Sequence, residues 1–331
     1  MKTKILNNYI TKRALFALSL VALPFATSLN AADFDTNGEE VTFSDVVEES
    51  GNINIFAGKL TMNNSSLGSS SGGRFNMSIG DSSSWSTLHM NDTTAYFNTI
   101  NFGGYMNSAK FINSNIFVDN AVEASATDFD QIEIHGGVFK APSIVKPYSS
   151  GSTGSTSILI TDGAYADFSV IDIASLTIEN STWRSFDNTV DTLYLKGNVV
   201  LDLYWADEYI SNSMCLFADT VVIEDNASVT FKVGFGDLMV ADIMEMEEYV
   251  NDGYVDFDFL QFFIFNTVVG NGTSDEFLVL VDSSDSYTWT VTDMGDGVFR
   301  MSDFALIPEP STYAAIFGAL ALALAIYRRR K

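Results

Sequence analysis

The sequence predicts an all-β protein with the form of a right-handed parallel β-helix, or solenoid. Short apolar runs alternate with polar residues at a period of two, which is typical of half-buried strands. The runs recur at roughly 20 residues, the length of one β-helix coil, and each coil needs its neighbours to bury its apolar face. Asn, Asp and Gly recur at the turns between runs, where they tolerate a left-handed backbone.

Residues 1–31 are expected to be a secretory signal peptide. Lys2, Lys4, Lys12 and Arg13 form a basic start, and residues 14–26 form an apolar stretch. Ala31 is a small residue suited to cleavage; an uncleaved N-terminal helix is the alternative. The chain from residue 32 is therefore expected to be exported.

Residues 32–236 are predicted to form the solenoid. The clearest strand pairs start at residues 53–55, 88–90 and 132–134, and each is followed by a turn and a second apolar run. Further copies begin at Leu159, Leu176, Leu193 and Val222, with weaker ones near Phe75, Ile100 and Phe111. Predicted turns contain Gly58, Gly136, Gly137, Asp162, Gly163, Asn180, Gly197 and Asn226. The repeat length is irregular, so an antiparallel β-sandwich with similar short strands is the alternative.

Two Ser/Gly-rich stretches, residues 65–73 and 141–157, are predicted to be loops. The pattern changes after residue 236, and residues 237–306 are predicted to form a C-terminal β cap over the end of the solenoid. Within it we expect a short helix at residues 237–252 and a closing hairpin whose turn is residues 293–297.

The composition is strongly acidic, with 42 Asp and Glu against 17 Lys and Arg and a formal net charge of −25. Eight of the 17 basic residues lie in the two end segments, so the part between them is more acidic still. Coulomb repulsion therefore argues against nucleic acid or anionic lipid as a partner of this part. Cys215 is the only cysteine, which excludes an intramolecular disulfide, and we expect it to be buried.

Catalytic candidates are few. The carboxylate pairs Asp128 with Asp130, Asp202 with Asp207, and Asp256 with Asp258 lack a diagnostic spacing, and we expect solvated acids at strand edges. Neither a metal site nor a cofactor is expected, since residues 293–297 lack the ligand pattern of a calcium loop. The two histidines, His89 and His135, are not accompanied by a nucleophile motif, and His135 is expected in a turn. We therefore predict that the chain is not an enzyme.

The last residues, 307–331, contain three parts in order. Pro308, Glu309 and Pro310 cannot continue a helix or strand, because proline lacks an N–H and fixes φ. An apolar run from Tyr313 to Tyr327 is expected to form one short transmembrane helix with a tyrosine at each interface. Arg328, Arg329, Arg330 and Lys331 follow and are expected on the cytoplasmic side.

This order of proline–glutamate–proline motif, helix and basic tail resembles the PEP-CTERM sorting signal of Gram-negative bacteria. The resemblance is confined to residues 307–331, and a plain tail anchor is the alternative. It implies recognition by a membrane-embedded processing enzyme, an exosortase, after an intermediate stage in the inner membrane.

Together these features predict an exported structural or adhesive protein of the cell envelope or extracellular matrix, with an exopolysaccharide as a further partner. Two alternatives stay open. One is a polysaccharide-acting enzyme on the same scaffold. The other is a carbohydrate-binding module with a sandwich fold, whose stacking platform would be Trp183 or Tyr204 with Trp205.

Overall fold

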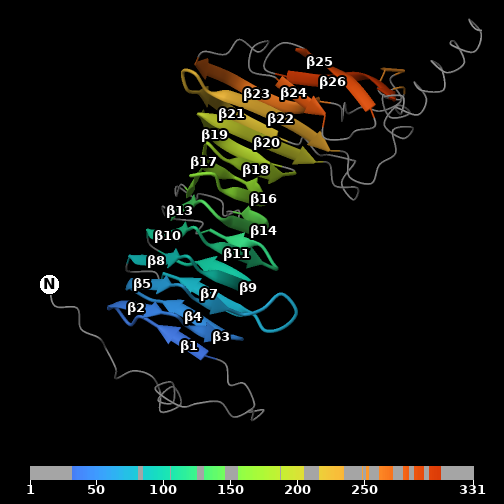
Figure 1. The fold of residues 1–331 in the computed structure, drawn as a ribbon. Helices are drawn as coiled ribbons and strands as arrows, with labels where there is room; N and C mark the ends of the chain where they lie inside the picture. Colours follow the sequence, from blue (N-terminus) through green and yellow to red (C-terminus); the bar gives the residue numbers. More distant parts are fainter. Residues whose placement is uncertain are drawn as a thin grey trace, which may run out of the picture.

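The computed structural model describes residues 32–80, 85–104, 106–124, 130–145, 156–186, 188–204, 216–234, 248, 251–252, 261–270, 279–282, 287–293 and 298–306. These residues form short strands that are stacked along one direction, from β1 at one end to β24 and β26 at the other (Figure 1). Within this part of the chain, no helix has the length and hydropathy needed to cross a membrane.

The first sheet follows the stack from end to end. In spatial order it contains β1 (Ala32–Asp35), β4 (Gly51–Ile55), β7 (Phe75–Ile79), β9 (Thr94–Phe102), β11 (Asn115–Val118), β14 (Val138–Val145), β16 (Tyr165–Ile171), β18 (Thr182–Ser185), β20 (Asn198–Tyr204), β22 (Ser228–Gly234) and β24 (Val279–Asp282). The short strands β3 (Val47–Glu48), β6 (Ser66–Leu67) and β12 (Val122–Glu123) pair beside this path.

The second sheet runs alongside the first. Its order is β2 (Glu40–Ser44), β5 (Gly58–Asn63), β8 (Ser86–Asn91), β10 (Asn107–Ile112), β13 (Asp130–His135), β15 (Thr156–Thr161), β17 (Ile173–Glu179), β19 (Thr189–Lys196), β21 (Leu216–Ile223), β23 (Gln261–Gly270), β26 (Val298–Leu306) and β25 (Tyr287–Asp293). We use "coil" for each segment of chain that adds one strand to each sheet.

Successive coils pair in parallel. The pairing of β1 with β4, of β10 with β13 and of β20 with β22 is parallel, as it is for the other described neighbours up to β24. An antiparallel sandwich is therefore wrong, and the all-β arrangement with two long parallel sheets is consistent with a β-solenoid. The two parallel sheets are buried on the faces that they turn toward each other.

Coil length varies without disturbing this pairing. Side chains that bond across adjacent coils are separated by 19 residues for Asn52 and Asp33 and by 24 for Asn76 and Asn52, and the Asn198 backbone N–H donates to the Asn180 side chain 18 residues earlier. The predicted spacing near 20 holds for many coils but not for all, since paired residues are 17 apart for Tyr165 and Thr182 and 49 apart for Thr230 and Val279. Most extra residues enter between strands, and the register itself shifts within the pairs β7–β9 and β14–β16.

In some coils the chain has an additional corner, so that one long strand pairs with two shorter strands of the next coil. Thr94–Phe97 of β9 pair with β11, whereas Ile100 and Asn101 in the same strand pair with β12. Strand β14 is divided in the same way between β11 and β12. The first sheet is therefore folded along its length, and the coils around β9 have three sides.

The core is built from columns of apolar side chains that continue from coil to coil. One column in the second sheet consists of Leu60, Leu88, Ala109, Ile132, Ile158, Leu176, Leu193 and Val221, all buried. Burial of each Leu, Ile or Val contributes about 1.5–3 kcal/mol. An aromatic column lies in the same core, with ring centroids 5.3 Å apart for Phe111 and Phe139 and 5.7 Å apart for Phe139 and Phe168.

Two strand predictions and two loop predictions need correction. Leu159 and Val222, predicted as the first apolar residues of repeat copies, face outward and are only partly buried, because Ile158, Ile160, Val221 and Ile223 fill the core on either side. The predicted loop at residues 65–73 contains strand β6. Likewise β14 continues through Pro142 to Val145, and its register shifts between Lys140 and Ser143. A bulge of this kind accommodates a proline that cannot donate a hydrogen bond.

The C-terminal end differs from the rest of the stack. Strands β25 and β26 pair antiparallel, which confirms the predicted hairpin, and β26 also pairs antiparallel with β23. The predicted helix at residues 237–252 lies outside the described residues except for Glu248, Asn251 and Asp252. The turn at residues 294–297, the signal peptide and residues 307–331 lie outside them as well.

Candidate functional site

A repeated corner follows the strands of the second sheet. Its first residue has a positive φ: 58° at Asp45, 49° at Asn64, 49° at Asp92 and 49° at Asn113. Asn and Asp adopt this conformation more readily than other residues with a side chain. The turn therefore explains why Asn or Asp recurs at one place in each of these coils.

In three of these corners the next residue carries a small buried hydroxyl, Ser65, Thr93 or Ser114, whereas Val46 follows Asp45. Ser65 Oγ accepts a hydrogen bond from the Val46 N–H at 3.2 Å, and Ser114 Oγ accepts one from the Thr93 N–H at 3.1 Å. The Ser114 hydroxyl is in turn within 2.9 Å of the Ile112 carbonyl and 3.0 Å of the Met90 carbonyl. These hydroxyls satisfy backbone groups that the turn leaves unpaired, and they fix each corner directly above the previous one.

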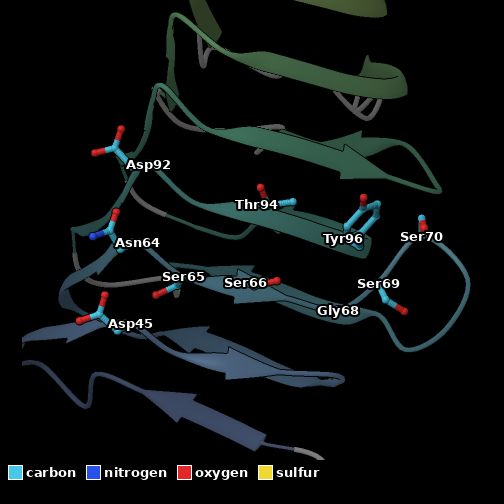
Figure 2. Close-up of a pocket in the computed structure, with 10 residues that line it drawn as sticks. All are labelled: Asp45, Asn64, Ser65, Ser66, Gly68, Ser69, Ser70, Asp92, Thr94 and Tyr96. Carbon is cyan, nitrogen blue, oxygen red and sulfur yellow. The ribbon is translucent and has the colours of Figure 1, made fainter.

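A groove of about 620 Å³ lies beside three of these corners (Figure 2). Asp45, Asn64 and Asp92 form one side, and Ser66 and Thr94 lie on the strands between the two sides. The loop at residues 68–70 and Tyr96 form the opposite side. The volume falls within the ~300–1,000 Å³ typical of small-molecule sites.

The groove exists because the outward side chains at its centre are small. Ser66 pairs with Thr94 in the adjacent coil, and Gly68 follows two residues after Ser66. Gly68 has a φ of +74°, and a Cβ there would lie 2.8 Å from the Gly73 carbonyl oxygen and 2.9 Å from that of Tyr96. Glycine is therefore required at this position, and the surface beside Tyr96 stays hollow.

Tyr96 is held in place from two directions. Its ring stacks on Phe117 with centroids 4.8 Å apart and an interplanar angle of 14°. The Arg74 guanidinium carbon lies 5.3 Å from the centre of the Tyr96 ring. Arg74 also pairs with Asp119 at 2.6 Å and donates to the Ser69 carbonyl, so it ties the loop to the stack.

A second polar group, the charged cluster, lies on the outward face of the second sheet. Glu133 Oε2 is 2.8 Å from Lys110 Nζ and 2.9 Å from His135 Nε2. His135 Nδ1 is 2.9 Å from Asp162 Oδ2, and His89 is adjacent to Lys110 by strand register. Both histidines of the chain therefore lie in one cluster, which sequence spacing did not reveal.

Two side chains of the charged cluster have shifted pKa values. Burial, together with the positive charges of Lys59 and Lys110, lowers the pKa of His89 despite an opposing effect of Glu133. Burial alone would raise the pKa of Glu133, but hydrogen bonds from Lys110 and His135 outweigh it and hold that pKa below its usual value. Glu133 therefore stays ionised near neutral pH and acts as the acceptor at the centre of the cluster.

The predicted site residues are scattered. Asp130 is 2 % exposed and accepts hydrogen bonds from the Asn107 N–H and side-chain amide, so its prediction as a solvated acid was wrong. Trp183 is fully buried, and its Nε1–H donates to the Phe168 carbonyl at 2.9 Å, which excludes it as a stacking platform. Asp202 pairs by register with Arg184 on an outward face.

Several predictions lie outside the described residues. They concern Asp128, Trp205, Asp207, Cys215, Asp256, Asp258, Pro308, Glu309, Pro310, Tyr313, Tyr327, Arg328, Arg329, Arg330 and the side chain of Tyr204. Within the described residues, no three His, Cys, Asp or Glu side chains converge as a metal site would need. The groove itself was not predicted, although the recurring Asn/Asp–Ser/Thr pairs at residues 64–65, 92–93 and 113–114 were a usable signal.

Comparison with protein-family models, with curated proteins and with solved structures found no match.

Proposed function

We propose that this chain is an exported structural or adhesive protein, a right-handed β-helix that an exosortase-type system sorts through the C-terminal signal. The observation that carries the proposal is the parallel pairing that continues from β1 to β24. At about 4.8 Å for each paired strand, such a stack extends roughly 50 Å. With the signal at the C-terminal end, the first coils would be the part farthest from the membrane.

The outer surface supports a scaffold role because polar side chains also continue from coil to coil. Asn52 donates to Asp33 at 2.8 Å, Asn98 to Asn76 at 3.1 Å, and Asn120 to Asn98 at 2.9 Å. We call this series, with Asn76 donating to Asn52 at 3.4 Å, the asparagine ladder. It reinforces the stack on its solvent side, as the apolar columns do inside.

Sorting is tested by changing Pro308, Glu309 and Pro310 together to Ala in a host that carries the processing enzyme. The apolar run is unchanged, so insertion should persist while processing stops and precursor accumulates in the inner membrane. Removal of residues 313–331 is the matched control and should release soluble protein. Fractionation with mass measurement of the C-terminus distinguishes these results. Normal processing of the triple variant would show that the C-terminus is only an anchor.

A further inference from the structure

The geometry points to the groove beside Tyr96 as a binding site for a neutral glycan chain. This inference supplies the adhesive part of the proposed function and rests on it. Three properties of the groove carry the assignment: polar side chains on one side, an immobilised aromatic ring on the other, and a negative local charge.

The polar side is free to bind a ligand. Asp45, Asn64 and Asp92 are exposed, and within the described residues their side chains make no hydrogen bond or ion pair. Their oxygens come from three successive coils, so they recur at roughly the 4.8 Å spacing of paired strands. A row of acceptors with this repeat suits the hydroxyl groups of an extended sugar chain, and the two carboxylates give the stronger, charge-assisted hydrogen bonds.

The aromatic side supplies the edge of a fixed ring, because Phe117 stacks on the Tyr96 ring from the next coil and Arg74 lies over it from the previous one. Tyr96 is half-buried and lines the groove. Phe117 and Arg74 hold the ring, which lowers the entropy lost when a ligand packs against it. A sugar ring carries apolar C–H groups beside its hydroxyls, and the edge of an amphipathic aromatic side chain can contact both.

Charge restricts the glycan class. Asp45 and Asp92 would repel uronate or sulfate groups, and Arg74 does not offset them because it is already paired with Asp119. A neutral chain forms the same hydrogen bonds without that repulsion. The inference is therefore for an uncharged glycan rather than for glycans in general.

The test uses the full-length chain in a zwitterionic detergent without a sugar headgroup. Binding is measured against cellohexaose, mannan and dextran as neutral glycans and against alginate as a polyanion. We expect binding to at least one neutral glycan and none to alginate. Y96A should weaken binding about tenfold or more, since a central aromatic contact carries a large share of binding energy.

A second variant fills the groove without touching the core. Ser66 is exposed on the groove floor, and S66Y should abolish binding while circular dichroism stays unchanged. Thr182 lies on an outward-facing position of β18, far along the stack, so T182Y is the matched control and should bind normally.

Three results would overturn the inference: no binding to any neutral glycan, preference for alginate, or binding that survives in both Y96A and S66Y. Each differs from a failure of the sorting proposal, which is measured by fractionation and not by glycan binding.

Discussion

Asn98 Nδ2 donates a hydrogen bond to Asn76 Oδ1 at 3.1 Å, across 22 residues of sequence and one coil of the stack. The Asn98 side-chain oxygen accepts the next bond, from Asn120. An interior member of the asparagine ladder therefore needs both a donor and an acceptor. Its first member, Asp33, only accepts, so a carboxylate suffices there.

This asymmetry predicts that N98D destabilises the protein by about 1 kcal/mol, because it removes a donor and brings a carboxylate near the Asn76 oxygen. D33N keeps the acceptor for Asn52 and should change stability little. Urea unfolding of the purified variants checks both. Equal midpoints for N98D and the original protein would show that the ladder adds nothing.

The corner hydroxyls should contribute more to stability than hydroxyls on the outward face of a strand. S114A leaves the buried Thr93 N–H without its acceptor, and we expect a loss of about 1–3 kcal/mol. S108A changes a half-buried outward hydroxyl on β10 and serves as the control, with an expected loss under about 0.5 kcal/mol. The same unfolding measurement compares them, and a larger effect from S108A would contradict the role assigned to Ser114.

The backbone at Asn113 makes a separate prediction. Its φ is 49°, a conformation that strains β-branched residues and suits glycine. N113V should therefore cost about 1–3 kcal/mol, whereas N113G should fall within about 1 kcal/mol of the original protein. If thermal unfolding ranks the valine variant at or above the glycine variant, the strain argument fails.

The charged cluster gives a pH dependence. The pKa of His89 lies below its ordinary value, so protonation favours the unfolded chain, and this part of the stability is lost as pH falls below about 6.5. K110M removes a positive charge that lowers this pKa, and the pKa should rise. An NMR titration of the His89 ring measures the change.

Lys196 lies on β19, several coils away, and K196M should leave the His89 titration unchanged. Glu133 has a dependence of the same sign at lower pH: its lowered pKa adds stability that is present near neutral pH and lost on acidification through about pH 4 and below. E133Q should therefore reduce stability at pH 7 and make little difference at pH 3. An effect of equal size at both values would argue against this electrostatic contribution.

The sequence predicted strands well where apolar residues strictly alternate. Ile53–Asn54–Ile55 and Ile132–Glu133–Ile134 have one face each, and the structure buries the isoleucines as expected. Runs such as Ile158–Leu159–Ile160 are apolar at every position, so period alone does not say which side faces the core. In the structure Ile158 pairs with Leu176 of the next coil and is buried, so the side that carries Ile158 faces the core.

The local sequence pattern was also insufficient to place two of the candidate site residues. Trp183 and Asp130 were assigned to the surface from residue type, but both point into the stack, where Phe168 and Asn107 supply their hydrogen-bond partners. Those partners are 15 and 23 residues away in sequence. No local pattern contains that information.

By itself the sequence determined the all-β class, the near-regular repeat and the identity of the turn residues, because alternation and left-handed turns are local properties of the chain. The tertiary structure alone decided which coil lies on which. That stacking places Asp45, Asn64 and Asp92 along one side of a groove and Tyr96 opposite them. It also joins His89, Lys110, Glu133 and His135 in one cluster. The physical reason is register: parallel pairing brings together residues about one coil apart, and coil length varies too much for spacing to reveal the partners.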